Sequence, residues 1–335
     1  MFSDEKYTYA LRKIQSVEPA IYFPIPNGRY VVTAGMRPLT TDYGNGPADG
    51  LAFQLDREFP ETFRQKLQAR RERLEKYYGE HKLDPQVREI AVAWIVERLA
   101  QEHPEYFQLE RDGERLALKC ALTKEELDFE YGELIESEGG EPEPLYASAL
   151  DALACQVQED IAIVQSTGGQ DHVAALHCCN PSHWAAESKI GKSFADVHVP
   201  VANFQQLSAN ATHLIQTMLK KGPFVRFTWG LSTNERLNHH PEPAPDVSPE
   251  EWFGPPYTQI TSASQLFMRI ERQFVQGFPE HGAFIFLVRT YYRNAVELSN
   301  AERADLRSAV ETMHPDSLKY KGLAEGQAQI LAALA

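Results

Sequence analysis

The sequence is poor in cysteine and contains no long apolar run. Only four cysteines occur among its 335 residues, and none has the CxxC spacing that is typical of zinc or cluster sites. No apolar stretch approaches the ~20 residues needed to span a bilayer. The N-terminal residues are also too polar for a secretory signal. We therefore expect a cytoplasmic protein that has no membrane contact and whose cysteines are free thiols.

The sequence also has fewer basic than acidic residues. The chain has 33 Lys and Arg against 47 Asp and Glu, for a net charge of -14. Such an excess of negative charge repels nucleic acids and anionic membrane surfaces. With 43% hydrophobic and 24% charged residues, the composition is that of an ordinary globular protein with a sizeable core. Solubility is the simplest role for the acidic surface, and a cationic partner is the alternative.

The first 144 residues predict an irregular arm followed by helices. Residues 1–55 are rich in Pro, Gly and Tyr, with one short strand expected at 29–33. Apolar residues recur at helical spacing over residues 56–78. A second helix is predicted to begin at Asp84 and Pro85, a capping residue followed by proline at the first helical position.

The segment before residue 144 predicts a hairpin, a short helix and a loop. Residues 105–122 read as the hairpin, with its turn at 111–114. Thr123 and Glu126 have the spacing of a capping box, which predicts the short helix. The acidic residues 130–143, with two glycines, predict an exposed loop and a soft domain boundary.

The second half alternates in the manner of an antiparallel sheet. Two strands are expected on either side of Gly168 and Gly169, and a helix over residues 202–221 connects them to three further strands. These three strands are predicted at 224–231, 266–275 and 283–292. The last 35 residues read as a helical tail that docks on the sheet or on another subunit.

The residues 173–201, VAALHCCNPSHWAAESKIGKSFADVHVPV, draw most attention as a functional stretch. His198 lies between valines and before Pro200, which predicts a ring shielded from water. Such a histidine is either a core imidazole bonded to a carbonyl or a metal ligand with one ring nitrogen free. His177 and His183 are the competing imidazoles.

Two of the predicted strands carry more charge than a core strand should. Their alternation groups Arg269, Glu271 and Gln273 on one face, and places Arg289 with Tyr291 on another. Burying a charge costs several kcal/mol unless it is paired. So many charged side chains in two strands indicate either mutual salt bridges or a polar ligand.

Several blocks, in order along the chain, resemble the haem-dependent oxidative N-demethylase α-subunit family. The resemblance spans most of the chain. The blocks are GMRPL at 35–39, VQED at 157–160, NPSHW at 180–184, KIG at 189–191, VHVPV at 197–201, 226–229, ERQ at 271–273 and VRTY at 288–291.

This resemblance implies a haem b cofactor and oxidation of a small methylated amine, such as dimethylamine, by dioxygen. It implies electrons from a separate reductase that carries FMN and a 2Fe-2S cluster and uses NADPH, and hence a hetero-oligomer. The expected roles are iron ligation by His198, contact with the cofactor by Trp184, and propionate binding by Arg272 and Arg289. Arg226 and Thr228 are expected to hold dioxygen, and Glu271 or Asp160 to act as counter-ion of the amine.

The expected fold is α+β, a PAS-like antiparallel sheet with helices on one face. The predicted segments are an N-terminal arm and helical region (1–144), a haem-binding core (145–298) and a helical tail (299–335). A haem PAS-type sensor without turnover and a non-haem protein with a structural His198 are the alternative hypotheses. The sequence leaves open the amine, the oligomeric state and any binding of folate.

Overall fold

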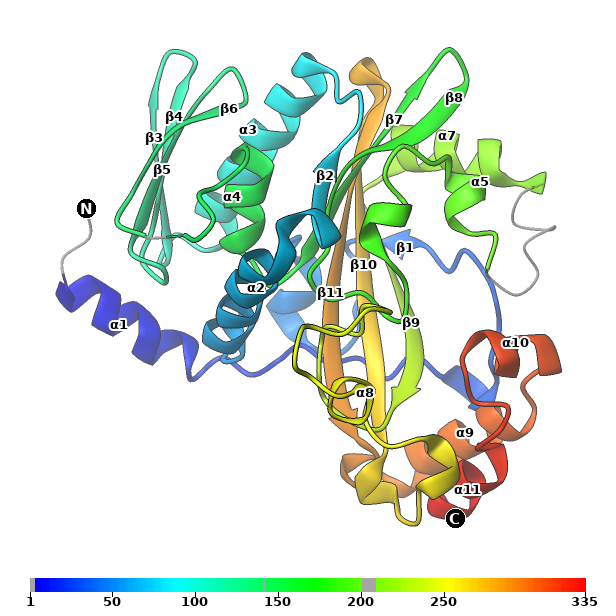
Figure 1. Ribbon diagram of the computed structural model, residues 1–335. Helices are drawn as coiled ribbons and strands as arrows, with labels where there is room; N and C mark the ends of the chain where they lie inside the picture. The colour runs from blue at the N-terminus through cyan, green and yellow to red at the C-terminus, as the bar shows by residue number, and fades with distance from the viewer. Residues whose placement is uncertain (1–3, 141, 201–208) are drawn as a thin grey trace.

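The computed structural model describes residues 4–140, 142–200 and 209–335. It shows a mixed α+β architecture, with a seven-stranded antiparallel sheet at the centre and a separate four-stranded sheet (Figure 1). Among the described residues, no helix combines the length and apolar character that a bilayer-spanning segment requires. The predicted α+β class is therefore confirmed.

The central sheet contains all five strands that alternation predicted in the second half of the chain. Two short strands from the N-terminal region extend it at both edges, so the sheet takes strands from both sides of the predicted boundary at residue 144. The strands in spatial order are β1 (Arg37–Pro38), β9 (Phe224–Ser232), β10 (Phe267–Phe278), β11 (Ala283–Asn294), β7 (Asp160–Thr167), β8 (Gln170–His177) and β2 (Tyr78–Glu80).

The register of β9, β10 and β11 separates the charged residues onto two faces. Thr228 lies opposite Glu271, and Arg226 lies opposite Gln273. Arg272 pairs instead with Arg289. Directly opposed residues share a face and neighbours along a strand do not, so Arg226 and Glu271 face one side of the sheet, and Arg272 the other.

The face that carries Arg226 and Glu271 is covered by α5 (Phe194–Val197) and α7 (Ala211–Lys221) (Figure 1). An apolar layer between these helices and the sheet includes Ile215 and Met218 of α7 and Val275 of β10. The predicted helix over 202–221 is confirmed from 211 onward. Its beginning, at 202–208, lies outside the described residues.

The opposite face packs against helices of the N-terminal half, α2 (Phe59–Arg73), α3 (Pro85–Glu102) and α4 (Ala149–Cys155). The predicted start of α3 is confirmed, because the Asp84 carboxylate accepts a hydrogen bond from the Gln86 amide at 2.8 Å. Apolar side chains such as Ile95 of α3 and Phe274 of β10 share this core.

Between α3 and α4 the chain forms the four-stranded sheet, in the order β3 (Phe107–Asp112), β4 (Arg115–Cys120), β5 (Glu125–Glu130) and β6 (Glu133–Glu138). The hairpin of β3 and β4 was predicted. The short helix at 123–126 and the loop through 133–138 are wrong, since β5 and β6 occupy these positions. Glu125, Leu127 and Phe129 alternate as buried residues in β5, and this two-residue period outweighs the capping pattern.

The chain termini differ most from expectation. The arm begins with a helix, α1 (Asp4–Ile14), that was not predicted, and residues 29–33 form no strand. The tail forms α9 (Asn300–Glu311), α10 (Pro315–Tyr320) and α11 (Gln327–Ala333). Gly28 of the arm, at φ +59°, lies so close to α9 that a Cβ atom would approach Ser308 to 3.1 Å. Arm and tail therefore pack together beside β9.

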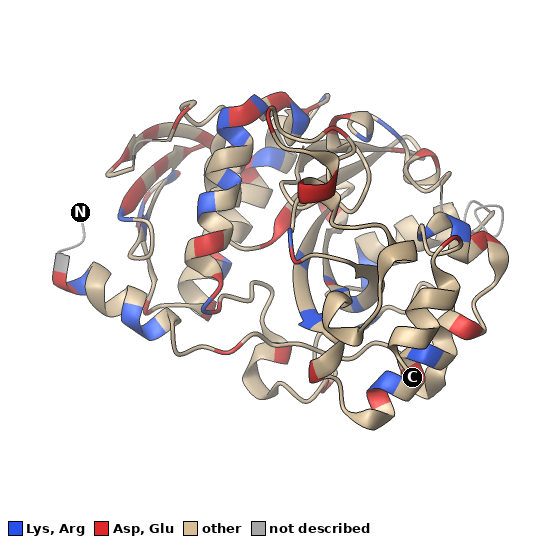
Figure 2. Cartoon of the chain, turned by 60° about the horizontal axis from the view of Figure 1, so that its bottom comes forward, with Lys and Arg blue, Asp and Glu red and all other residues tan. Residues whose placement is uncertain are grey.

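Charge is spread over the molecule. Figure 2 shows acidic and basic segments interleaved along the helices, with further acidic segments on the small sheet. Many of the charges pair locally, as in Arg64 with Glu61 on α2. Such mixing suits the solvation role expected for the acidic excess.

Candidate functional site

The segment around His198 is anchored to the edge of the central sheet. The Gly191 amide donates to the Val173 carbonyl, and the Val173 amide donates to Lys192, both at 2.9 Å. Gly191 is required here, because it has φ +75° and a Cβ atom would come within 3.1 Å of the His81 ring. Ser193 then caps α5 by accepting from the Asp196 amide. His198 ends the helix.

The His198 ring has one engaged nitrogen and one free nitrogen. Nδ1 lies 2.7 Å from the Phe194 carbonyl oxygen. A carbonyl only accepts, so Nδ1 carries the hydrogen and Nε2 keeps its lone pair. Among the described residues, Nε2 has no hydrogen-bond partner.

Electrostatics keep this ring neutral. Burial lowers the pKa of His198 below its ordinary value, and the cations of Arg226 and Lys189 lower the pKa further. The ring is less shielded from water than expected, because it is half-buried at the end of a helix and Val199 is 54% exposed. A neutral imidazole with an accessible Nε2 is suited to bind a metal.

Arg226 is a cation that has no partner among the described residues and could therefore bind a ligand. Its Nε is buried without a hydrogen-bond partner. Its guanidinium group forms no hydrogen bond or salt bridge with any described residue. Glu271 and the Tyr30 hydroxyl act on its charge from a longer distance. Thr228 lies on the same face, opposite Glu271.

Apolar side chains form the wall between His198 and the sheet. Phe194 and Val197 of α5 are only partly buried and pack on the same cluster as Trp184 and Phe286. The rings of Phe194 and His198 are 4.2 Å apart. Trp184 thus lies in the same apolar layer as the segment that carries His198.

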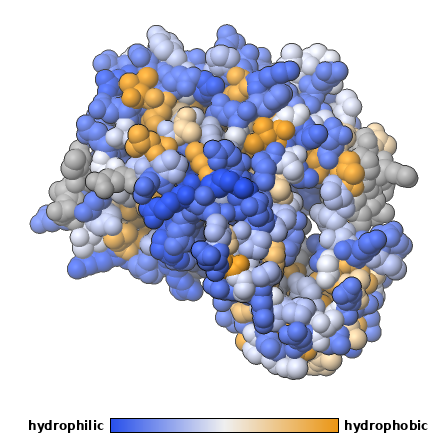
Figure 3. Space-filling view, in the orientation of Figure 1, coloured by the Kyte–Doolittle hydropathy of each residue, from blue (hydrophilic) through white to orange (hydrophobic). Residues whose placement is uncertain are grey.

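Three residues that the sequence did not single out act on the charges of Glu271 or Arg226, or respond to them. Tyr320 and Lys321 come from the tail, and Tyr30 comes from the arm. Glu271 acts on the charge of both tail residues, and Tyr30 is coupled to Tyr320 and Arg226. Figure 3 shows a notch between the main body and the lobe that contains α9–α11 in Figure 1. No local pattern marks these residues, because Tyr320 and Lys321 lie at the end of a short helix and Tyr30 lies in the irregular arm.

Arg272 and Arg289 do not join this group. Arg272 donates to the Leu51 and Ala52 carbonyls at 2.6 and 3.2 Å. Arg289 binds the Asp56 carboxylate at 2.7 Å. Both side chains are buried on the opposite face of the sheet from Glu271. We therefore do not retain them as partners of a group bound to His198.

The alternative histidines lie in other surroundings. His177 is buried, 3.3 Å from Asp151, and together with Cys155 they form the one His, Cys, Asp and Glu group of metal-ligand spacing in the described part of the chain. Both Asp151 oxygens already accept from Arg70 at 2.8 Å, a cation that would repel a metal ion. This group is therefore an ion-pair network.

His183 and Asp160 are also engaged elsewhere. The His183 ring stacks on Phe253, with 5.5 Å between centroids. The Asp160 carboxylate accepts from the Cys179 and Asn180 amides at 2.9 and 3.1 Å, which fixes the turn after β8. Asp160 is therefore committed to the fold, and Glu271 is the carboxylate that faces Arg226.

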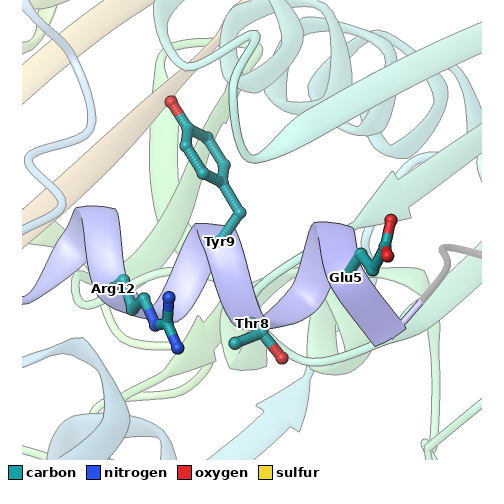
Figure 4. Close-up of a pocket in the computed structure, with 4 residues that line it drawn as sticks. All are labelled: Glu5, Thr8, Tyr9 and Arg12. Carbon is teal, nitrogen blue, oxygen red and sulfur yellow. The ribbon is translucent and has the colours of Figure 1, made fainter.

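Two hollows elsewhere in the described residues are weaker candidates for a ligand site than the group around His198. Figure 4 shows one on α1, where Tyr9 and Arg12 point in different directions, at the far end of the molecule from α5 in Figure 1. The other, a cavity of about 190 Å³, is lined by Gln54, Asp56, Glu102 and their neighbours. It is smaller than the ~300 Å³ at which ligand pockets begin, and its lining is acidic.

The model of one protein family, described as haem-dependent oxidative N-demethylase, alpha subunit-like, matches residues 50–331. The chain belongs to this family. The match covers most of the chain and includes His198, Arg226, Glu271 and Lys321. The family description names haem as the group on which activity depends, and an alpha subunit as one part of a larger assembly.

The residues around His198 fit a haem. Haem requires an axial ligand, an apolar slot and cations for its propionates. His198 offers a neutral nitrogen, the partly buried Phe194, Val197 and Trp184 offer apolar contacts, and Arg226 offers an unpaired cation. The Arg226 Nε is buried without a partner. A buried donor is costly unless a ligand pairs with it, and this observation agrees best with a bound anionic or polar group.

Arg226, which has no partner, and Arg289, which is paired with Asp56, are expected to affect stability differently when each is replaced. Arg226→Met removes an unpaired cation, and we expect the free energy of unfolding of the haem-free protein to stay level or to rise by about 1 kcal/mol. Arg289→Met leaves Asp56 unpaired and serves as the matched comparison, with an expected loss of about 3 kcal/mol. Urea unfolding measures both values. A similar loss in the two variants would show that Arg226 is paired in the folded protein.

Proposed function

We propose that this chain is the haem-binding subunit of an enzyme that uses dioxygen to demethylate a small amine of the dimethylamine kind. The products are formaldehyde and the shorter amine. The observation that carries the proposal is the free Nε2 of His198, which the Phe194 carbonyl orients, together with an unpartnered Arg226 that acts on the charge of this ring. The family description supports the reaction class.

Haem, when bound, supplies the redox chemistry that activates dioxygen. The residues of the chain supply placement and polarity. His198 would hold the haem through Nε2, and Arg226 and Thr228 would offer hydrogen-bond donors on the sheet face. Glu271 offers a carboxylate to the ammonium group of the amine. The apolar layer with Trp184 and Phe194 limits the access of water.

The order of elements supports a PAS-like core. Strands β7 and β8 precede α5 and α7, and β9, β10 and β11 follow, with β7 and β11 adjacent in the sheet. The helices with His198 lie on one face, which is the arrangement expected for a haem pocket in such a fold. The term alpha subunit supports a partner subunit, which we propose to be the reductase with FMN, a 2Fe-2S cluster and NADPH.

The test is formaldehyde release from dimethylamine by haem-loaded protein with reductase and NADPH. We expect turnover that depends on all three components and on dioxygen. A gas sensor on the same scaffold would bind haem and dioxygen without releasing formaldehyde. The carboxylate of Glu271 on the pocket face favours the enzyme, since a sensor of neutral gases has no need of a counter-ion for an amine.

A further inference from the structure

The middle of the central sheet is only partly covered on the face that carries Arg226 and Glu271. Strands β9, β10 and β11 are neighbours within this sheet (Figure 1). Several of their side chains on this face are half-buried, namely Arg226, Thr228, Glu271, Gln273, Phe286 and Val288. A small ligand can therefore still reach the polar groups among them.

Gln273 lies between the two charged groups of this patch. It is directly opposite Arg226 across β9 and β10, and it precedes Val275 and follows Glu271 on the same face of β10. Its amide Nε2 donates a hydrogen bond to one oxygen of the Glu271 carboxylate at 3.2 Å. Gln273 is thus in contact with the carboxylate and adjacent to the strand position of the guanidinium.

The other oxygen of Glu271 is held from the opposite side by Arg269. The Arg269 Nε lies 3.4 Å from this oxygen, while the same guanidinium donates to the Asn180 and Leu237 carbonyls at 2.6 and 2.9 Å. Each carboxylate oxygen therefore has one donor. Since each has two lone pairs and the side chain is 20% exposed, the carboxylate can still accept from a ligand.

Glu271 and Arg226 carry opposite charges but form no ion pair. Diagonal neighbours on an antiparallel pair of strands lie ~7–8 Å apart, within reach of long side chains. Glu271 acts on the charge of Arg226, yet no salt bridge or hydrogen bond joins the two in the described part of the chain. The carboxylate oxygen that could turn to Arg226 is instead bound to the Gln273 amide.

We propose that Gln273 is a positioning residue that keeps Glu271 apart from Arg226, so that the carboxylate stays free for a small alkylammonium ion. Opposite charges in a half-buried patch attract more strongly than in water. Without the amide, the released oxygen would turn to Arg226 and the two charges would neutralise each other. The inference rests on the proposed function only for the identity of the cation as the amine substrate.

The direct test is a crystal structure of haem-loaded Gln273→Met. Methionine is unbranched and flexible like glutamine, but it cannot donate this hydrogen bond. We expect the Glu271 carboxylate to lie within about 4 Å of the Arg226 guanidinium, with the strand register unchanged. A Glu271 carboxylate that remains apart from Arg226 in this variant would overturn the proposal.

Calorimetric titration of the haem-loaded protein with dimethylammonium chloride measures the consequence for binding. We expect Gln273→Met to weaken the affinity at least about tenfold, the size of one hydrogen bond to a charged group. Gln276→Met is the matched control, because Gln276 lies on the opposite face of β10 and donates to the Gly277 carbonyl at 2.9 Å. It should bind as the wild type does. Equal affinities of wild type and Gln273→Met would contradict the positioning role.

A second substitution separates capture of the charge from lost packing. In Arg226→Met no cation is present to capture Glu271, so adding Gln273→Met should change the amine affinity no more than about twofold relative to Arg226→Met. Removal of Arg226 should thus rescue the binding that Gln273→Met loses. A similar loss on adding Gln273→Met with and without Arg226 would show a structural role and would overturn the proposal.

Formaldehyde assays on the wild type keep the two hypotheses distinguishable. Formaldehyde release, with equal amine affinities of wild type and Gln273→Met, would reject the positioning role and leave the proposed function standing. The expected loss and rescue of binding without formaldehyde release would retain the role of Gln273 and reject the demethylase. A wild type that neither binds the amine nor releases formaldehyde would reject both.

Discussion

Replacing His198 with glycine is expected to abolish the haem absorption band of the ligated protein and to lower formaldehyde release by at least about a hundredfold. The physical reason is the loss of Nε2, the nitrogen that the Phe194 carbonyl orients by holding Nδ1–H. Absorption spectroscopy after reconstitution with haem measures the effect. Free imidazole should restore the band in His198→Gly, because the space left by the ring can admit it.

His213 provides the matched control. It lies exposed on α7, close to the same face of the sheet, and His213→Ala should leave the spectrum unchanged. His183→Ala tests the competing ligand and should also retain the band. An unchanged spectrum in His198→Gly, with loss of the band in His183→Ala, would move the axial ligand to the His183 segment.

Asp151→Asn is expected to cost about 3–5 kcal/mol of stability. The two Asp151 oxygens bind Arg70 at 2.8 Å, and neither side chain has exposed surface. The substitution keeps the shape but leaves the Arg70 cation without its counter-ion between α2 and α4. Urea unfolding gives the change in the free energy of unfolding, and an unchanged slope would show that the unfolded state is unaffected.

The exposed pair of Glu61 and Arg64 on α2 provides the control for this buried pair. Each of its side chains is 54% exposed, so Glu61→Gln should cost no more than about 0.5 kcal/mol. Equal losses in Asp151→Asn and Glu61→Gln would contradict the assigned importance of burial.

The same aspartate predicts a pH dependence of stability. Burial alone would raise the pKa of Asp151, but His177 at 3.3 Å and the hydrogen bonds from Arg70 outweigh burial and hold the pKa well below its ordinary value. A depressed pKa adds stability above the unfolded value, near ~3.9, and this contribution is lost as the pH falls further. In Asp151→Asn that part of the acid dependence should be missing.

Periodicity predicted the central sheet well, because its strands are long and half-buried. Arg269, Glu271 and Gln273 alternate in the sequence, and they share one face in the structure. The same rule failed for β6, where three of six residues are acidic and five are exposed. An edge strand pairs on one side only, so it can form without an apolar pattern. Its partner β5, which has a buried face, supplies the pairing.

The candidate site was predicted in part. The sequence singled out His198, Arg226, Thr228 and Glu271, and the fold brings them to one face. It could not reveal Tyr30, Tyr320 or Lys321, because contacts with the tail and the arm join residues far apart in the chain. Lys321 reaches Trp229, which lies 92 positions earlier.

The sequence by itself determined the five long strands of the central sheet and the two-residue alternation that sorts polar side chains between its faces. Only the tertiary structure decided which charges are satisfied. Arg289 and Arg226 read alike as strand arginines, yet Asp56, 233 positions away, pairs with Arg289 alone. The reason is physical: pairing depends on distance in space, and the cost of burial falls on whichever cation the fold leaves without a counter-ion.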